Sequence, residues 1–398
     1  MSIPPLRVSA YTLCTAAGDG REQTLEALRA RRSGLRPNDF GATPIDTWIG
    51  RVAGLEDSVL PDALTQWDCR NNRLAWRGLT TDGFREAALA ARDRYGPARV
   101  AVVMGTSTSS IGASEEAYTR LDADGAYPAD LRRPIIHTPH SIGDFVQHAL
   151  GLTGVSVTVA TACSSSAKVF AQAERLIRLG LADAAVVGGV DTLCGSVLFG
   201  FNSLELVSPE PCRPFDVARR GINLGEAAGF ALLEREAAHG AWLIGYGESS
   251  DAHHMSTPHP QGLGARAAVT ATLERAGITP ADVDYINLHG TASLKNDEVE
   301  AMVVKDLFPA TTVASSTKGW MGHTLGAAGI VEAAICLLAL EHSLLPGTLN
   351  AQMLDPACGP QVRRDNVTQN CRTALSFSFG FGGSNCVLAF AREDAVSR

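Results

Sequence analysis

Strand-like and helix-like runs alternate along almost the whole chain, and this alternation limits the folds that are open to it. Short runs rich in valine and alanine, such as 155–161, lead into longer amphipathic runs, such as 164–179. This pattern is typical of layered α/β folds. The expected strands are 99–104, 155–161, 184–190, 229–233, 285–288, 312–315, 374–379 and 386–390, and the expected helices are 20–31, 78–92, 142–150, 164–179, 264–276, 297–307 and 326–341.

Composition excludes several classes of protein. Of 398 residues, 45% are hydrophobic and 19% are charged, as in a globular protein with a large core. The nine cysteines include no Cys-x-x-Cys pair, which favours reduced thiols and a cytoplasmic location. The first residues do not resemble a signal peptide, and Asp191 and Glu332 interrupt the most apolar stretches, so we expect no membrane span. The net charge of −8 argues against nucleic acid as a partner.

Cys163 lies in Val-Ala-Thr-Ala-Cys-Ser-Ser-Ser, where a predicted strand turns directly into a predicted helix. The positive end of a helix dipole and free backbone N–H groups favour a thiolate at such a position. The small residues Ala162 and Ser164 to Ser166 should let a substrate approach the sulfur. This pattern indicates a nucleophile. The alternative is a buried, inert cysteine, which is the usual state of this residue type.

Two histidines and a glycine-rich turn strengthen the nucleophile interpretation. His289 opens His-Gly-Thr after a strand-like run, and His323 follows Lys318 in a stretch rich in glycine. Residues 379–385, Phe-Gly-Phe-Gly-Gly-Ser-Asn, form a further turn between two strand-like runs. Loops at the ends of strands often carry catalytic residues.

In their order and spacing these segments resemble the elongating β-ketoacyl-[acyl-carrier-protein] synthases of the thiolase superfamily, from about residue 100 to the end of the chain. Arg-Pro-Phe-Asp at 213–216 and Gly-Glu-Ala-Ala-Gly at 225–229 add to the resemblance, and two histidines indicate the Cys-His-His group. The resemblance implies a duplicated, five-layer α-β-α-β-α thiolase-like fold. Residues 1–240 would form the half with the nucleophilic cysteine, and residues 241–398 the half with both histidines. A similarity between 158–163 and 312–317 is a weak internal sign of such a repeat.

The resemblance also implies a decarboxylative Claisen condensation. Cys163 would hold the acyl group as a thioester, and His289 and His323 would donate hydrogen bonds to the enolate that forms when malonyl thioester loses carbon dioxide. Lys318 would support the histidines, and Glu332 would pair with that lysine, since a buried lysine without a partner is costly.

The resemblance assigns further residues to substrate binding. The backbone N–H groups of Cys163 and Phe381 would form the oxyanion hole, and Phe381 would gate the cavity. Thr108 would reach the acyl pocket of a neighbouring subunit. The remaining substrate-binding candidates are Thr291 and Ser293 for the phosphopantetheine arm, and Phe199, Phe201 and Phe379 for the acyl pocket.

The expected partner is an acyl carrier protein, whose phosphopantetheine carries the substrates, so we expect neither a metal nor another cofactor. A homodimer is expected, with a heterodimer of related subunits as the other possibility. Arg70, Arg73 and Arg77 could dock the carrier or simply form a solvated helix face. The family usually has Arg-Asp-Gly where this chain has Arg219-Arg220-Gly221, and the loop before Arg213 lacks the basic residue of many relatives.

Two other functions are compatible with parts of this pattern. A non-catalytic partner resembling a chain-length factor would have lost the nucleophile, whereas Cys163 and both histidines are present. A degradative thiolase would place a second catalytic cysteine near the last glycine-rich turn, and Cys386 instead falls within a strand-like run. The residues do not distinguish fatty acid synthesis from polyene or polyketide synthesis, nor do they fix the length or saturation of the acyl chain.

Overall fold

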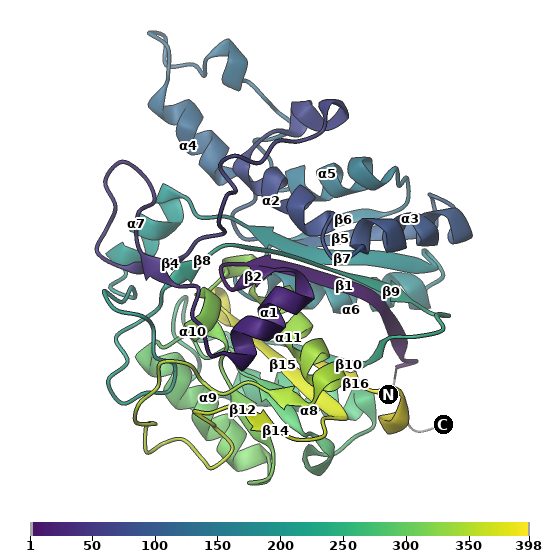
Figure 1. Ribbon diagram of the computed structural model, residues 1–398, viewed down its shortest axis with the longest axis vertical. Helices are drawn as coiled ribbons and strands as arrows, with labels where there is room; N and C mark the ends of the chain where they lie inside the picture. Colours follow the sequence, from purple (N-terminus) through teal and green to yellow (C-terminus); the bar gives the residue numbers. More distant parts are fainter. Residues whose placement is uncertain (1–2, 397–398) are drawn as a thin grey trace.

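The computed structural model describes residues 3–396, and its largest sheet runs through the whole molecule (Figure 1). The strand order is β6-β5-β7-β9-β1-β10-β16-β15-β11-β12. These strands are β1 (Leu6–Thr15), β5 (Val100–Gly105), β6 (Ser156–Val159), β7 (Ala184–Asp191), β9 (Ala227–Glu234), β10 (Ala241–Ser250), β11 (Tyr285–Asn287), β12 (Val313–Ser315), β15 (Thr373–Gly380) and β16 (Ser384–Ala391). The short strands are β2 (Gly18–Asp19), β3 (Arg36–Pro37), β4 (Trp48–Gly50), β8 (Leu224–Gly225), β13 (Leu344–Leu345) and β14 (Val367–Thr368).

The sheet consists of two halves with the same topology. In the first half, β1 pairs with β9 and β9 pairs with β7, both antiparallel. β7 then pairs with β5, and β5 with β6, both parallel. From β10 outward, β16 and β15 are likewise antiparallel, and β11 and β12 follow in parallel. The halves meet where β1 pairs with β10 over three residues, beginning at Leu6 and Leu243. The expected duplicated fold is confirmed.

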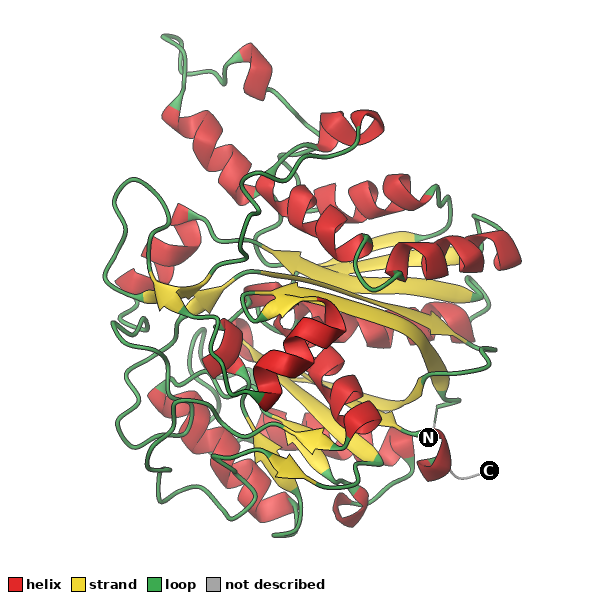
Figure 2. Ribbon diagram, viewed as in Figure 1, coloured by secondary structure: helices red, strands yellow, loops and turns green. Residues whose placement is uncertain are grey.

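Helices cover both faces of each half, which creates the layers seen in Figure 2. α6 and α11 lie in the middle, where Phe170 and Ile335 belong to the core between the two halves. α2, α3 and α5 cover the outer face of the first half, and α8 and α9 cover that of the second. The helices are α1 (Gly20–Arg29), α2 (Arg70–Leu79), α3 (Phe84–Tyr95), α4 (Ile111–Thr119), α5 (Ser141–Leu150), α6 (Ser165–Arg178), α7 (Gly195–Ser203), α8 (Leu263–Ala276), α9 (Leu294–Leu307), α10 (Lys318–Met321) and α11 (Ala328–His342).

The fold brings the predicted catalytic residues of the two halves together. Cys163 follows β6, His289 follows β11, and the loop that contains His323 follows β12. β6 and β11 run in opposite directions along the sheet, and the loops that follow them meet because the two halves face each other across α6 and α11. The two halves therefore supply one common site.

Several elements differ from the sequence expectations, and two of them show the physical reason. The single helix expected over 78–92 is wrong, because Asp82 and Gly83 adopt left-handed backbone conformations that separate α2 from α3. The strand β10 was not among the expected strands, and it contains Gly245 and Gly247. A Cβ atom at Gly247 would lie 1.9 Å from the carbonyl oxygen of Ala268, so this glycine permits close packing of α8 on the sheet.

Within the described residues, one helical stretch, Leu325–His342, has the length and apolar composition of a membrane span. Inside the molecule 89% of it is buried, because it forms the central layer together with α6. This degree of burial is that of a core helix.

Candidate active site

The turn that carries Cys163 is strained and held by its own serines. Ala162 has a φ of 51°, a left-handed conformation that is costly for a residue with a Cβ atom. Ser164 Oγ donates to the carbonyl of Thr161 (2.9 Å), and Ser165 Oγ donates to that of Ala162 (2.6 Å). These serines therefore fix the turn. They are fully buried and do not leave open space for a substrate, which differs from the expectation from their small size.

Cys163, His289 and His323 converge beneath the surface. The Nε2 atom of His323 lies 3.0 Å from the Sγ atom of Cys163. The two imidazole rings are 5.3 Å apart and nearly perpendicular. One donor atom from each of the three residues lies within 4.8 Å of the other two, and all three side chains are buried. A reacting carbonyl at the sulfur would thus be within reach of both imidazoles.

Backbone hydrogen bonds hold both histidines. Glu300 in α9 accepts the N–H groups of His289 and Gly290, each at 2.7 Å. His323 donates its N–H to the carbonyl of Asn223 (2.7 Å) and accepts from Gly225 (2.9 Å). Burial raises the pKa of Glu300 to about 8. Sequence reasoning missed Glu300 and Asn223; the only signals were a carboxylate in the helix after His-Gly-Thr and an asparagine before the 225–229 motif.

Lys318 and Glu332 form a buried ion pair behind the histidines. Lys318 Nζ donates to Glu332 Oε1 (2.5 Å) and also to the backbone carbonyl of His289. Ser378 Oγ donates to the other oxygen of Glu332 (3.2 Å). Burial raises the pKa of Glu332 to about 7, against the opposing effect of Lys318. The pair links α11 to the His289 loop and places a positive charge near both imidazoles.

Burial controls the charge states at this site. It lowers the pKa of His289 and of His323 well below the ordinary value, and the charge of Lys318 lowers both further. Burial also raises the pKa of Cys163 to about 11, although the N–H of Phe381 and the charge of Lys318 act in the opposite direction. The free site therefore holds a thiol and two neutral imidazoles near pH 7. Burial therefore opposes the thiolate that the helix terminus was expected to favour.

A small cavity of about 50 Å³ opens at the three residues. Thr291 and Ser293 line one side, and their hydroxyl groups are hydrogen bonded at 2.9 Å. Of the predicted aromatic residues, three line the cavity: Phe201, Phe379 and Phe381. The rings of Phe201 and Phe381 lie 5.6 Å apart, with Phe381 on the turn between β15 and β16. The polar wall suits an arm with amide groups, and the aromatic wall suits an acyl chain.

Two predicted substrate residues lie elsewhere. Both the N–H and the hydroxyl of Thr108 donate to Asp191, at 3.0 and 2.8 Å. The Thr108 side chain is therefore hydrogen bonded within its own subunit. Thr108 lines a separate hollow next to Ala160. Phe199 in α7 is 50% exposed and lies beside Pro44, outside the cavity of Cys163. The role of Thr108 toward a neighbouring subunit remains a prediction.

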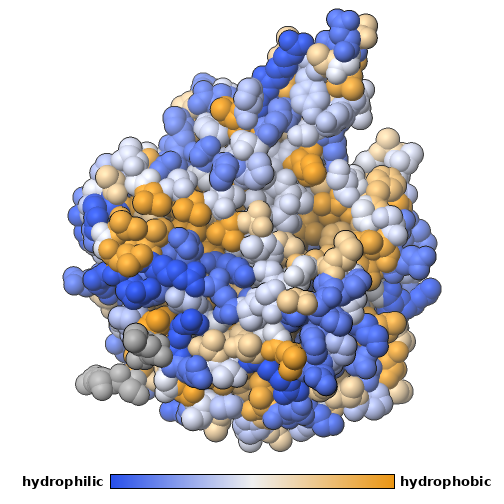
Figure 3. Space-filling view, turned by 180° about the vertical axis from the view of Figure 1, so that it is seen from behind, coloured by the Kyte–Doolittle hydropathy of each residue, from blue (hydrophilic) through white to orange (hydrophobic). Residues whose placement is uncertain are grey.

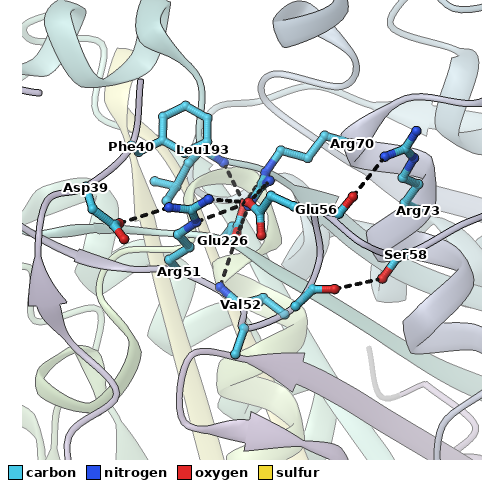
Figure 4. Close-up of polar contacts among 12 residues, drawn as sticks. Asp39, Phe40, Arg51, Val52, Glu56, Ser58, Arg70, Arg73, Leu193 and Glu226 are labelled. Atoms are coloured by element: carbon cyan, nitrogen blue, oxygen red, sulfur yellow. Dashed lines mark hydrogen bonds and ion pairs between the residues drawn. The ribbon is translucent and has the colours of Figure 1, made fainter. Parts of the chain in front are cut away.

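The arginines considered for carrier docking are engaged in ion pairs, as Figure 4 shows for Arg70. Arg70 donates two hydrogen bonds to the fully buried Glu226, at 3.0 and 2.6 Å, and also contacts Glu56. Arg73 pairs with Asp68 on the same surface. Arg77 pairs with Asp19. These side chains do not form a free basic face.

The donor set of Cys163, His289 and His323 could by its chemistry also hold a metal ion. A ligating imidazole normally donates its second N–H to a carboxylate or carbonyl, which fixes the ring. The Nδ1 atoms of His289 and His323 are buried, and neither has such a partner among residues 3–396. Among these residues the two rings thus lack the hydrogen bond that usually orients a metal-ligating imidazole.

Comparison with known proteins agrees with this geometry. The N-terminal domain of β-ketoacyl synthases matches residues 71–239, and the C-terminal domain matches residues 241–352. Nodulation protein E of Rhizobium meliloti (strain 1021) is 34% identical over 324 residues, which cover 78% of this chain and 79% of that protein. The mitochondrial 3-oxoacyl-[acyl-carrier-protein] synthase of Arabidopsis thaliana is 38% identical over 263 residues, 61% of this chain and 57% of that protein.

A chain of the Xenorhabdus doucetiae ketosynthase ApeO in complex with its chain length factor ApeC has a similar structure, with a TM-score of 0.88, 36% identity and 98% coverage of both chains. The chain therefore belongs to the β-ketoacyl synthase family. It is an acyltransferase that forms a carbon–carbon bond by decarboxylative condensation, and the two alternative functions are not favoured.

Proposed function

We propose that Cys163 is the residue that carries the acyl group. The observation that supports this most directly is the 3.0 Å contact between its Sγ atom and Nε2 of the neutral His323. As Sγ attacks the carbonyl carbon of an acyl thioester, its proton passes to His323. The new carbon–sulfur bond forms, the bond to the phosphopantetheine sulfur breaks, and that sulfur takes the proton from His323. The N–H groups of Cys163 and Phe381 stabilise the oxyanion between these events.

His289 and His323 then act on malonyl thioester. Loss of carbon dioxide leaves an electron pair on the α-carbon, and the charge moves onto the thioester oxygen. Neutral imidazoles can donate a ring N–H to this oxygen, His289 directly and His323 once its proton has moved from Nδ1 to Nε2, and the low pKa values keep both rings neutral. The α-carbon attacks the acyl group on Cys163, the carbon–sulfur bond to the enzyme breaks, the cysteine sulfur takes up a proton from solvent, and the β-ketoacyl product remains on phosphopantetheine.

The carrier and a second subunit complete the proposal. An acyl carrier protein would deliver both substrates, and Thr291 and Ser293 would bind the phosphopantetheine arm in the cavity. A second subunit of the same fold would pair along β6, either as another copy or as a related chain. A relative of known structure is a ketosynthase in complex with a chain length factor. Figure 3 shows hydrophobic side chains gathered beside a hydrophilic band on the face opposite that in Figure 1.

Two further expectations belong to this proposal. Each step uses groups of the chain or of its substrates, so the reaction needs no metal and no cofactor beyond the phosphopantetheine of the carrier. The nine cysteines are free thiols, which supports a cytoplasmic location.

The test is acylation of the intact protein. After incubation with an acyl carrier protein, peptide mapping by mass spectrometry should place the acyl group on Cys163, and Cys163→Ala should take up none. Cys212→Ala is a matched control, because Cys212 is equally buried but lies outside the cavity. A label on another cysteine, or undiminished acylation of Cys163→Ala, would contradict the proposal.

A further inference from the structure

Asp191 is a fully buried carboxylate at the end of β7. Its two oxygens accept hydrogen bonds from the turn after β5 and from a loop of the second half. The donors in the turn are the hydroxyl of Thr106, the N–H (2.9 Å) and hydroxyl (2.8 Å) of Ser107, and the N–H (3.0 Å) and hydroxyl (2.8 Å) of Thr108. The donor in the loop is the N–H of Gly326 (2.6 Å). All these donors are uncharged, so hydrogen bonds take the place of a cation at this carboxylate.

Both segments that bind Asp191 contain a strained residue. Ser109, in the turn after β5, has a φ of 45°, and Leu325, directly before Gly326, has a φ of 58°. Such left-handed conformations are costly for these residues and persist only where the surrounding structure enforces them. Gly326 bonds to the carboxylate directly. Ser109 donates its N–H to Thr106 Oγ1 (2.7 Å), whose hydroxyl bonds to the same carboxylate. One side chain therefore holds two strained turns, one from each half of the molecule.

The loop that Asp191 holds also carries His323, three residues before Gly326. The Nε2 atom of His323 contacts Sγ of Cys163, whereas its Nδ1 atom is buried without a hydrogen-bond partner among residues 3–396. No hydrogen bond at Nδ1 therefore orients the ring, and its placement depends on packing and on the backbone that carries it. The segment 223–225 fixes the backbone of His323 itself. Asp191 fixes the residues that follow.

We propose that Asp191 is a positioning residue for His323, which holds the loop so that Nε2 stays within reach of Sγ of Cys163. This rests on the proposed function, in which His323 takes the proton of the thiol. Asp191 lies outside the lining of the cavity and acts only through the loop. Without its carboxylate the strained turn at Leu325 relaxes, and the imidazole moves with it. A displacement of about 1 Å is enough to slow a reaction by about 10².

The test is Asp191→Asn, which keeps the shape of the side chain but replaces one acceptor oxygen with an amide that cannot accept an N–H. Transfer of the acyl group from acyl carrier protein to Cys163 is followed by intact mass in the wild type, in His289→Ala and in His323→Ala. We expect Asp191→Asn to slow transfer about tenfold to hundredfold in the first two backgrounds. In His323→Ala it should cost less than about twofold, because the group that it positions is already gone.

Two further variants separate positioning from folding. Ser107→Ala leaves the carboxylate in place and removes a hydroxyl that donates to Asp191 and accepts the N–H of Gly326 (3.2 Å). It should give a smaller loss with the same dependence on His323. Glu174→Gln is the matched control, because Glu174 is 1% exposed and accepts from a neutral hydroxyl, but lies near the last turn of α6. It should leave acyl transfer unchanged, and urea unfolding shows which variants are folded.

The dependence on His323 decides the outcome. An equal loss from Asp191→Asn in all three backgrounds would overturn the proposal, since it would show a general loss of structure. Unchanged acyl transfer in a folded Asp191→Asn protein would overturn it as well. Where Asp191→Asn does not fold, Ser107→Ala decides: no loss, or an equal loss in all three backgrounds, overturns the proposal. If the wild type takes up no acyl group on Cys163, the proposed function itself fails.

Discussion

At the scale of single residues, burial has more influence on the chemistry than position in the chain does. Cys163 lies at a helix N-terminus, yet its desolvation raises the pKa of the thiol to about 11. The same desolvation keeps His289 and His323 neutral. Nucleophilicity at this site therefore depends on proton transfer to His323 during attack and not on a standing thiolate.

Alkylation of Cys163 tests this charge state. Below its pKa the thiolate fraction of a thiol rises tenfold per pH unit. The rate of iodoacetamide modification of Cys163 should therefore keep rising from about pH 7 to 9.5 without a plateau. Peptide mapping by mass spectrometry follows this cysteine separately from the other eight. A plateau near neutral pH would show that the helix terminus and Lys318 outweigh burial.

Replacing the histidines should separate the two half-reactions. His289→Ala and His323→Ala should each slow carbon dioxide release from malonyl carrier protein by about 10² or more, the usual cost of one oxyanion donor. Only His323 contacts Sγ, so His323→Ala should also slow acyl transfer, whereas His289→Ala should largely retain it. Near-normal carbon dioxide release in both variants would remove the histidines from this step.

The sequence predicts only those residues of the site that lie in recognisable local motifs. Cys163, His289 and His323 each lie in a short motif at the end of a strand. Asp191 shows what was missed: it accepts hydrogen bonds from the turn after β5 and from Gly326 (2.6 Å), partners far from it in the sequence. Such contacts, like the effect of burial on Cys163, exist only once the chain has folded.

At the scale of elements, buried charges connect the short strands near His323 to the first half. Glu226 follows β8 and accepts the N–H groups of Val52 (3.0 Å) and Leu193 (3.1 Å) in addition to Arg70 of α2 (Figure 4). β8 also forms a bridge from Leu224 to His323. The ion pair thus supports the backbone that positions a proposed catalytic histidine.

Arg70→Met should destabilise the protein by about 3 kcal/mol, because it leaves the carboxylate of Glu226 buried without its cation. Arg73→Met, one turn away on α2, is the control. It removes a pair whose side chains are 30% and 34% exposed, and we expect a loss of about 1 kcal/mol or less. Urea unfolding of both variants measures the difference, and equal losses would show that the burial of Glu226 does not matter.

The secondary structure could be predicted best where strands alternate with amphipathic helices, as for β5, β6, β7 and α6. The prediction of secondary structure failed where tertiary packing requires a glycine within a strand. Gly247 in β10 is needed because α8 packs against the backbone there, and this contact cannot be seen in the sequence. β1 was missed although Leu6 to Ala10 alternate between apolar and polar residues, because the alternation is lost from Tyr11 onward, where every residue is buried.

At the scale of the whole molecule, one end of the sheet is a strand whose outer edge pairs with no other strand among residues 3–396. β6 is the last strand of the first half, and its residues are half-buried. The N–H of Val102 bonds to the carbonyl of Val155 (2.8 Å), and that of Thr106 bonds to Val159 (3.1 Å). By alternation, Ser156 and Thr158 direct their backbone groups away from β5. An edge of this kind readily pairs with a strand of another chain.

Thr158→Pro should therefore abolish assembly with a second subunit while leaving the pairing of β6 with β5 in place. Proline removes the outward N–H donor of residue 158, which β5 does not use. Light scattering should change from dimer to monomer for this variant, and condensation should fall with it, because a neighbouring subunit is expected to complete the acyl pocket. Thr158→Val keeps the N–H and a β-branched side chain and should remain dimeric and active. Circular dichroism checks that the proline variant is folded. A folded proline variant that stays dimeric, or a fully active monomer, would show that assembly does not run through β6.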